Sequence, residues 1–141
     1  MKMLIVDDLW ENRKLLQGIL KPYGRCDTGA NGMEGLELFK NALEEGEPYR
    51  LVLLDIMMPH MDGQETLRQM RQLEHQQRQD GPLESAILMV TALGDPGEAL
   101  KAFFHGYCTD YLIKPVTQPR LLAKLVEMGV LTTQQIAATH D

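Results

Sequence analysis

Residues 51–55 are Leu-Val-Leu-Leu-Asp, four branched apolar residues followed at once by a carboxylate. An apolar run without polar alternation is typical of a strand covered on both faces, as in the centre of a parallel sheet. Similar short runs occur at Met3–Val6, Ala86–Val90 and Tyr111–Ile113, and a weaker one lies at Arg25–Thr28. These five segments are the predicted strands.

Longer amphipathic stretches separate the strands, so that strand and helix alternate along the chain. Alternation of this kind is typical of an α/β protein with right-handed crossovers between parallel strands. We therefore predict an open, doubly wound five-stranded parallel sheet with five helices. The first predicted helix contains Leu15–Leu20, and the second begins after Asn31-Gly32 and ends near Gly46. The third contains Leu67–Leu73 and has a polar end at His75–Gln79. The fourth runs from Asp95 to about Gly106, and the fifth from Thr117 to Gly129.

The composition is that of an ordinary globular protein, with 44% apolar and 24% charged residues in a chain of 141. A net charge of −6 argues against general nucleic-acid binding, which requires concentrated Lys and Arg. No stretch approaches the roughly 20 apolar residues that span a bilayer. Cys26 and Cys108 have no metal-type spacing and are expected to be reduced thiols. We expect a cytoplasmic protein.

The predicted elements occupy residues 1–129, which we take as one domain. The last twelve residues, 130–141, show no apolar period, and we expect this tail to contribute little to the core. No DNA-binding, methylesterase or cyclic-nucleotide domain follows the last predicted helix, so a stand-alone protein is expected.

Polar residues follow four of the predicted strands: Asp7 and Asp8, then Asp55, Thr91 and Lys114. In doubly wound sheets the functional site lies at the carboxyl ends of the strands. Three carboxylates gathered there repel one another unless a cation joins them. A site with few protein ligands at strand ends suits Mg²⁺, which keeps several waters and is bound by one or two carboxylates plus phosphate.

A carboxylate in such a site can also act as a nucleophile and form an aspartyl-phosphate. Phosphoryl transfer then needs mainly positioning and positive charge around the phosphoryl oxygens. Lys114 supplies a flexible positive charge, and Thr91 supplies a hydroxyl donor. Each residue alone is more commonly a cap, a turn residue or a solvated side chain. Their occurrence at successive strand ends points to a phosphoryl-transfer site.

Four motifs match a known pattern: LIVDD at 4–8, LLDIMMPHMDG at 53–63, VTAL at 90–93 and DYLIKP at 110–115. With these motifs, residues 1–129 resemble the receiver domain of two-component response regulators. One departure is Tyr107, which stands where the family usually has Gly, four residues before the aromatic residue on the fifth strand.

The resemblance implies a role for each matching residue. Asp55 would be the phosphoacceptor and a metal ligand, Asp8 the direct metal ligand of the acidic pair, and Asp7 the residue that holds a metal-bound water. The Met57 carbonyl would complete the protein ligands, and Thr91 and Lys114 would contact the phosphoryl group. Tyr111 would be the aromatic residue that changes position in the switch, and the Lys114–Pro115 bond would be cis. The implied cofactor is Mg²⁺.

The implied function is to accept a phosphoryl group from a sensor histidine kinase or a histidine phosphotransfer protein. The chain would then relay the group, drain a kinase, or bind a protein target through the face of the fourth helix, fifth strand and fifth helix. It would catalyse only its own phosphorylation and dephosphorylation. The cognate kinase, the target and the oligomeric state are not encoded in a recognisable pattern.

Three alternatives stay open. A phosphohydrolase of the haloacid-dehalogenase type would need a second Asp two residues after the nucleophile, where this chain has Met57. A flavodoxin-like FMN site would need phosphate-binding amides in the first loop, where Asp7 and Asp8 would repel the phosphate. A phosphorylation-independent scaffold would lack one of the five site residues, and all five are present.

Overall fold

A computed structural model describes residues 1–55, 63–77, 84–91 and 107–139 of the chain. The strands of this part form one parallel sheet in the order β2-β1-β3-β4-β5. The predicted open five-stranded sheet is therefore confirmed, with β3 at its centre. The strands are β1 (Lys2–Val6), β2 (Arg25–Gly29), β3 (Leu51–Asp55), β4 (Ala86–Thr91) and β5 (Asp110–Ile113).

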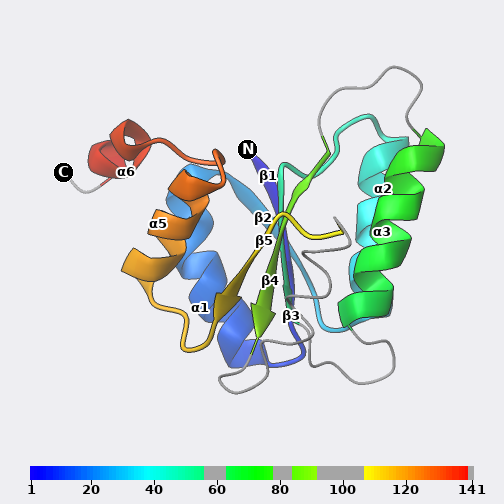
Figure 1. Cartoon of the computed structure of the whole chain (residues 1–141), viewed down its shortest axis with the longest axis horizontal. Coiled ribbons are helices and arrows are strands. Elements are labelled where there is room, and N and C mark those ends of the chain that lie inside the picture. Colours follow the sequence, from blue (N-terminus) through cyan, green and yellow to red (C-terminus); the bar gives the residue numbers. More distant parts are fainter. Residues whose placement is uncertain (56–62, 78–83, 92–106, 140–141) are drawn as a thin grey trace.

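Helices cover both faces of the sheet: α1 and α5 lie on one side, and α2 and α3 lie on the other (Figure 1). The predicted fourth helix, residues 95–106, lies outside the described residues. The helices are α1 (Trp10–Leu20), a 3-10 turn η1 (Lys21–Tyr23), α2 (Gly32–Glu44), α3 (Gly63–Gln77), α5 (Gln118–Glu127) and α6 (Thr133–Thr139).

Two apolar cores lie on opposite faces of the sheet because successive side chains of a strand point to opposite sides. On β1, Leu4 and Val6 belong to the core under α2 and α3, whereas Met3 and Ile5 belong to the core under α1 and α5. The same alternation occurs along β3 and β4. The apolar runs that predicted the strands are therefore explained by burial on both faces.

The starts of two helices are fixed by side-chain caps. The Asn31 side chain accepts a hydrogen bond from the Glu34 amide at 2.9 Å, at the start of α2. The Thr117 hydroxyl accepts one from the Arg120 amide at 3.4 Å, at the start of α5. Such caps satisfy amides that have no partner inside the helix, and the predicted start of the last helix at Thr117 is confirmed.

The C-terminal segment packs against the domain, contrary to the expectation that it would contribute little to the core. Val130 and Leu131 are 8% and 3% exposed and belong to the core under α1 and α5. Residues 133–139 form α6, and its Ile136 packs against the same core. The prediction failed because one buried dipeptide and a seven-residue helix are too short to show a period in the sequence.

Both cysteines are free thiols, as predicted. Burial is the main cause that raises the pKa of the Cys26 and Cys108 thiols to about 11.

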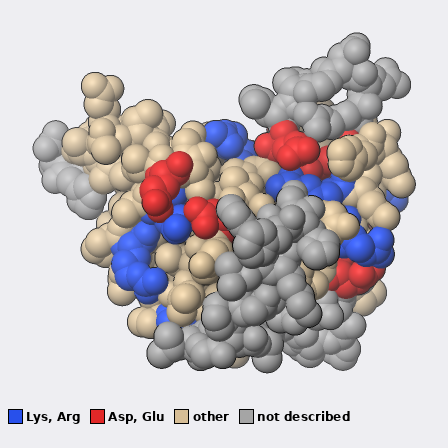
Figure 2. Space-filling view, in the orientation of Figure 1, with Lys and Arg blue, Asp and Glu red and all other residues tan. Residues whose placement is uncertain are grey.

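On the face shown in Figure 2, acidic and basic side chains are interspersed. Within the described part of the chain, every helix is too short or too polar to cross a bilayer.

Candidate functional site

Three carboxylates meet at the carboxyl edge of the sheet. Asp7 and Asp8 follow β1, and Asp55 is the last residue of β3, the strand next to β1. One carboxylate oxygen from each lies within 4.8 Å of the others. Asp7 and Asp55 are 3% and 4% exposed, while Asp8 is exposed. The predicted convergence of these side chains is confirmed, and the cluster is an all-oxygen donor set with one open side.

Asp7 is also bound by the first turn of α1. Its Oδ1 accepts a hydrogen bond from the Leu9 amide at 2.9 Å, and its carboxylate accepts from Asn12 Nδ2 at 3.3 Å. The Arg13 guanidinium donates to the Asp7 carbonyl at 2.8 Å. Asn12 and Arg13 were not identified from the sequence. They stand five and six residues after Asp7, in the first turn of the following helix, and this spacing is the pattern that could have predicted their contact with Asp7. These bonds orient one carboxylate and leave Asp8 facing solvent.

Lys114 and Thr91 complete the site from the two strands beyond β3. The Lys114 amide donates to the Thr91 carbonyl at 2.7 Å, which joins the ends of β5 and β4. The Lys114 ammonium reaches Asp55, with 3.5 Å between Nζ and Oδ2. Thr91 is 1% exposed. The Lys114–Pro115 peptide is cis.

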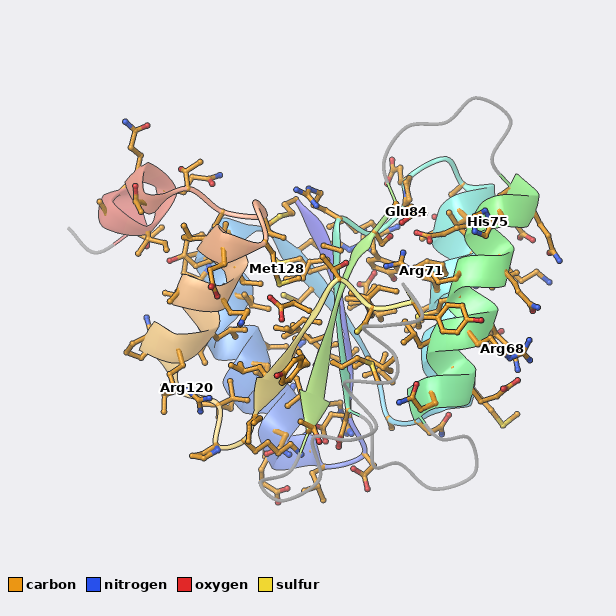
Figure 3. The ribbon with its side chains drawn as sticks, viewed as in Figure 1. Arg68, Arg71, His75, Glu84, Arg120 and Met128 are labelled. Carbon is orange, nitrogen blue, oxygen red and sulfur yellow. The ribbon has the colours of Figure 1, made fainter. Side chains whose placement is uncertain are left out.

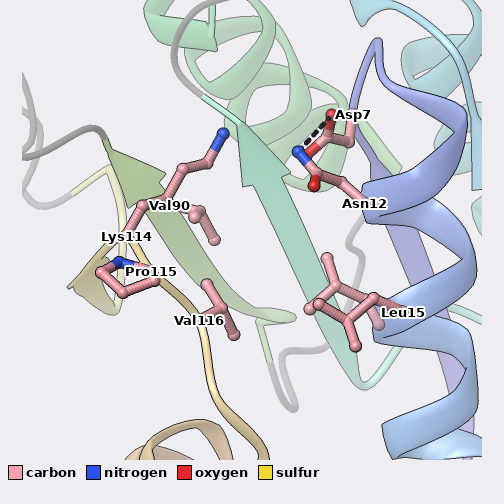
Figure 4. A pocket seen from close by; sticks show the side chains of 8 residues that line it. Asp7, Asn12, Leu15, Val90, Lys114, Pro115 and Val116 are labelled. Carbon is pink, nitrogen blue, oxygen red and sulfur yellow. Dashed lines mark hydrogen bonds between the residues drawn. The ribbon is translucent and has the colours of Figure 1, made fainter.

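A cleft of about 470 Å³ opens beside this cluster, between α1 and the loop after β5. Asp7 and Asn12 line one side and Lys114 the other, with the apolar side chains of Leu15 and Val116 further along (Figure 4). The charged groups thus lie at one end of a cavity that is otherwise apolar.

Tyr111 and Met57 are the two remaining residues of the expected site, and only Tyr111 lies among the described residues. Tyr111 lies on β5, is partly buried and packs against the core on the α3 side of the sheet. Met57 lies outside the described residues, so its expected carbonyl ligand stays a prediction.

The geometry favours two chemical roles. Three clustered carboxylates repel one another by about 1 kcal/mol per pair even at the dielectric constant of water, and by more where they are buried. An oxygen-preferring divalent cation relieves that repulsion, so the residues present fit such an ion. Asp55 is the member of the cluster that also lies 3.5 Å from the Lys114 ammonium. A carboxylate at this position could attack a phosphoryl group while positive charge surrounds the transferred oxygens.

Comparisons with known proteins show which family the chain is similar to. The chain matches the family model described as "Response regulator receiver domain" over residues 3–126. It is 33% identical over 125 residues to the transcriptional regulatory protein CpxR homolog of Haemophilus influenzae, covering 88% of this chain and 48% of that protein. It is 32% identical over 125 residues to the signal transduction histidine-protein kinase BarA of Escherichia coli K12, covering 86% of this chain and 12% of that one.

Among solved structures, the CheX-CheY-BeF3-Mg+2 complex from Borrelia burgdorferi contains a chain that is similar at a TM-score of 0.76, with 26% identity. The match covers 93% of this chain and 90% of that one. The chain belongs to the response regulator receiver domain family of two-component signalling. It spans 48% and 12% of the length of the two curated relatives named above.

Proposed function

We propose that this chain accepts a phosphoryl group on Asp55 in a Mg²⁺-dependent reaction and passes on the signal as a response regulator. The observation that supports this most directly is the position of Asp55. Its carboxylate lies within 4.8 Å of those of Asp7 and Asp8, and its Oδ2 lies 3.5 Å from the Lys114 ammonium. A nucleophile, a cation site and a positive side chain are thus within reach of one phosphoryl group.

Asp7, Asp8 and Asp55 are the residues that would hold the metal, with the Met57 carbonyl as a further expected ligand. When bound, Mg²⁺ would neutralise charge on the phosphoryl oxygens and reduce repulsion among the carboxylates. The similar complex from Borrelia burgdorferi contains Mg²⁺, which supports this choice of ion.

The chain's own residues account for the remaining chemistry. An Asp55 carboxylate oxygen attacks phosphorus, and the bond from phosphorus to the donor nitrogen or oxygen breaks as the aspartyl-phosphate forms. The Lys114 ammonium moves from Asp55 to the phosphoryl oxygens, and the Thr91 hydroxyl donates to another of them. Burial of Asp55 and Thr91 limits the access of water to the product.

The phosphoryl donor is proposed to be a histidine kinase or a histidine phosphotransfer protein, and the response would be relay, drainage of the kinase, or binding of a target. The likeness to part of the histidine kinase BarA supports a partner of this class. The scaffold alternative is less favoured because the acidic cluster and Lys114 are assembled. The phosphohydrolase alternative lacks its second acid, since residue 57 is Met.

Intact-mass analysis tests the proposal. With acetyl phosphate and Mg²⁺, the protein should gain a single phosphoryl adduct that is lost at alkaline pH. Asp55→Asn and EDTA should each abolish it, whereas Glu44→Gln, which changes an exposed carboxylate on α2, should not. An undiminished adduct on Asp55→Asn would show that another residue is phosphorylated. Unchanged labelling in EDTA would show that the reaction does not require a metal.

A further inference from the structure

A buried ion pair lies on α3 at the opposite end of the sheet from the acidic cluster. Arg71 Nη1 and Glu74 Oε1 are 2.7 Å apart, and the two side chains are only 7% and 5% exposed. A second ion pair of the same spacing, Glu65 with Arg68, lies on the same helix, but its side chains are 41% and 43% exposed. Arg71 extends from α3 toward the sheet, while Arg68 lies on the outer side (Figure 3).

The pair is connected to the backbone just before two strands. Arg71 Nε donates to the Tyr107 carbonyl at 2.6 Å, and Nη1 donates to the Ser85 carbonyl at 3.0 Å. Glu74 Oε2 accepts from the Ser85 amide at 2.8 Å. Ser85 lies directly before β4, and Tyr107 lies three residues before β5. One guanidinium thus binds the entries of both strands to α3.

The connection has a particular consequence for β5, because β5 is an edge strand. In the described part of the sheet, it pairs with β4 alone. The Thr109 amide donates to the Ile87 carbonyl at 2.9 Å before β5 begins, and the Lys114 amide donates to the Thr91 carbonyl at 2.7 Å after it ends. Arg71 therefore holds the start of the strand whose other end bears Lys114. The side chains that pack this strand and its entry on the core facing α3 are Tyr107, Cys108 and Tyr111.

A buried ion pair is a poor device for stability alone, since desolvation offsets much of the attraction between its charges. Its usual advantage is directional: a guanidinium offers several donors in a fixed planar arrangement that a hydrocarbon or an ammonium cannot reproduce. Here the three bonds from Arg71 end on three different groups, and two of these groups are carbonyls of separate segments. This geometry specifies where the segments lie relative to one another.

We propose that Arg71, held by Glu74, is a positioning residue that clamps the start of β5 to α3 and thereby sets the places of Tyr111 and Lys114. The effect on phosphorylation rests on the proposed function of Asp55; the clamp itself does not. When the clamp is released, β5 should open from its N-terminal end. Lys114 would then spend less time within reach of Asp55, although Arg71 lies at the other end of the strand.

Arg71→Lys is the decisive variant, because Lys can still pair with Glu74 but cannot reach the Tyr107 and Ser85 carbonyls together. Arg68→Lys, on the outer side of the same helix, is the matched control. The readout is amide hydrogen exchange by NMR in the unphosphorylated protein. The reporters are the amides of Thr109 and Lys114 at the two ends of β5, and those of Asp7 and Arg25, which donate to Gly29 and Met1 on the far side of the sheet.

In Arg71→Lys we expect exchange at Thr109 and Lys114 to accelerate about 10- to 100-fold, the factor that corresponds to losing one hydrogen bond to a charged group. Exchange at Asp7 and Arg25 should not change, and Arg68→Lys should behave as the wild type. Unchanged exchange at Thr109 and Lys114 would overturn the clamp. So would an equal acceleration at all four amides, which would show a general loss of stability.

Glu74→Gln is a milder second variant that keeps an acceptor for the Ser85 amide and removes the charge that holds Arg71. It should accelerate exchange at the same two amides by a smaller factor, and no acceleration there would also overturn the clamp. The rate of acetyl phosphate labelling should fall in Arg71→Lys relative to Arg68→Lys. If the wild type takes no label, the proposed function fails, while the exchange data still decide the clamp.

Discussion

Asp7 and Asp8 are neighbours in the chain but differ in what holds them. Asp7 is buried and accepts hydrogen bonds from the Leu9 amide and the Asn12 side chain, so its carboxylate links the end of β1 to the first turn of α1. Asp8 is exposed and contributes its charge to the cluster around Asp55. We therefore expect Asp7 to contribute to both folding and metal binding, and Asp8 mainly to metal binding.

Asp8→Asn should thus stabilise the metal-free protein, because it removes one of three clustered negative charges. Asp8 takes part in two of the three pairwise repulsions, each about 1 kcal/mol in water, so the expected gain is about 2 kcal/mol at low salt. Urea unfolding with EDTA and with Mg²⁺ measures both effects. Mg²⁺ should raise the midpoint of the wild type and change that of Asp8→Asn far less.

Asp7→Asn is the comparison for that experiment. It removes the same charge but weakens the bonds to Leu9 and Asn12, so its metal-free midpoint should lie below that of Asp8→Asn. Mg²⁺ binding, followed by the fluorescence of the exposed Trp10, should be weakened more by Asp8→Ala than by Asp7→Ala. The opposite order for Mg²⁺ binding would show that Asp7 is the principal ligand.

At the scale of elements, two glycines in helices have opposite surroundings. A Cβ at Gly35 would lie 2.6 Å from a methyl carbon of Val6, because α2 packs closely on β1 there. A Cβ at Gly18, inside α1, would have no atom of the described residues within 4 Å. Gly35→Ala should therefore destabilise by about 1–3 kcal/mol through overpacking. Gly18→Ala should stabilise by about 0.5–1 kcal/mol through helix propensity. Urea unfolding of both variants tests this pair, and a neutral Gly35→Ala would mean that α2 can shift.

The C-terminal segment allows a second prediction at this scale. Gly129, directly after the C-cap Met128 of α5, has a φ of +76°, and the amides of Val130 and Leu131 donate back to the Leu125 carbonyl at 2.9 and 3.2 Å. This turn directs both side chains into the core. Truncation after Gly129 should lower the free energy of unfolding by about 3 kcal/mol, from the loss of two buried aliphatic side chains.

Truncation after Thr132 is the control for that experiment, because it keeps Val130 and Leu131 and removes α6. The loss should then be smaller, since α6 contributes only the partly buried Ile136 and a 3.0 Å bond between the Tyr23 and Thr139 hydroxyls among the described residues. If both truncations were as stable as the full chain, the segment would be as dispensable as its sequence suggested.

At the scale of the whole molecule, phosphorylation is expected to act through Thr91 and Tyr111. The phosphoryl oxygens would draw the Thr91 hydroxyl toward Asp55, and the space left would let Tyr111 change its rotamer on the adjacent strand. One hydrogen bond to a charged group is worth about 1.5–3 kcal/mol. The population of the active form should therefore rise about ten- to a hundredfold.

NMR spectra with and without beryllofluoride, a phosphoryl mimic, measure this shift. Changes should extend from Asp55 through Thr91 to Tyr111 and the remainder of β5. Thr91→Ala should retain changes around Asp55 but lose those at Tyr111. Changes confined to the surroundings of Asp55 in the wild type would indicate a relay protein that does not switch this face.

The sequence by itself determined the sheet and most of the acidic site. Apolar runs without alternation identify strands that are buried on both faces, and parallel strands place their carboxyl ends on one edge. Asp7, Asp8, Asp55, Thr91 and Lys114 could therefore be brought together from their positions after strands. Local patterns were sufficient to predict these features, because each apolar run and the polar residue that follows it lie within a few residues of one another.

Only the tertiary structure decided the roles of residues whose partners are distant in the chain. Arg71 and Glu74 share a helix face with the buried Leu67 and Met70, but a charged pair at that spacing is usually solvated. Its burial depends on the Ser85 and Tyr107 backbone, 14 and 36 residues beyond Arg71. The packing of Val130 and Leu131 likewise depends on the core under α1 and α5, whose other residues are mostly distant in the chain.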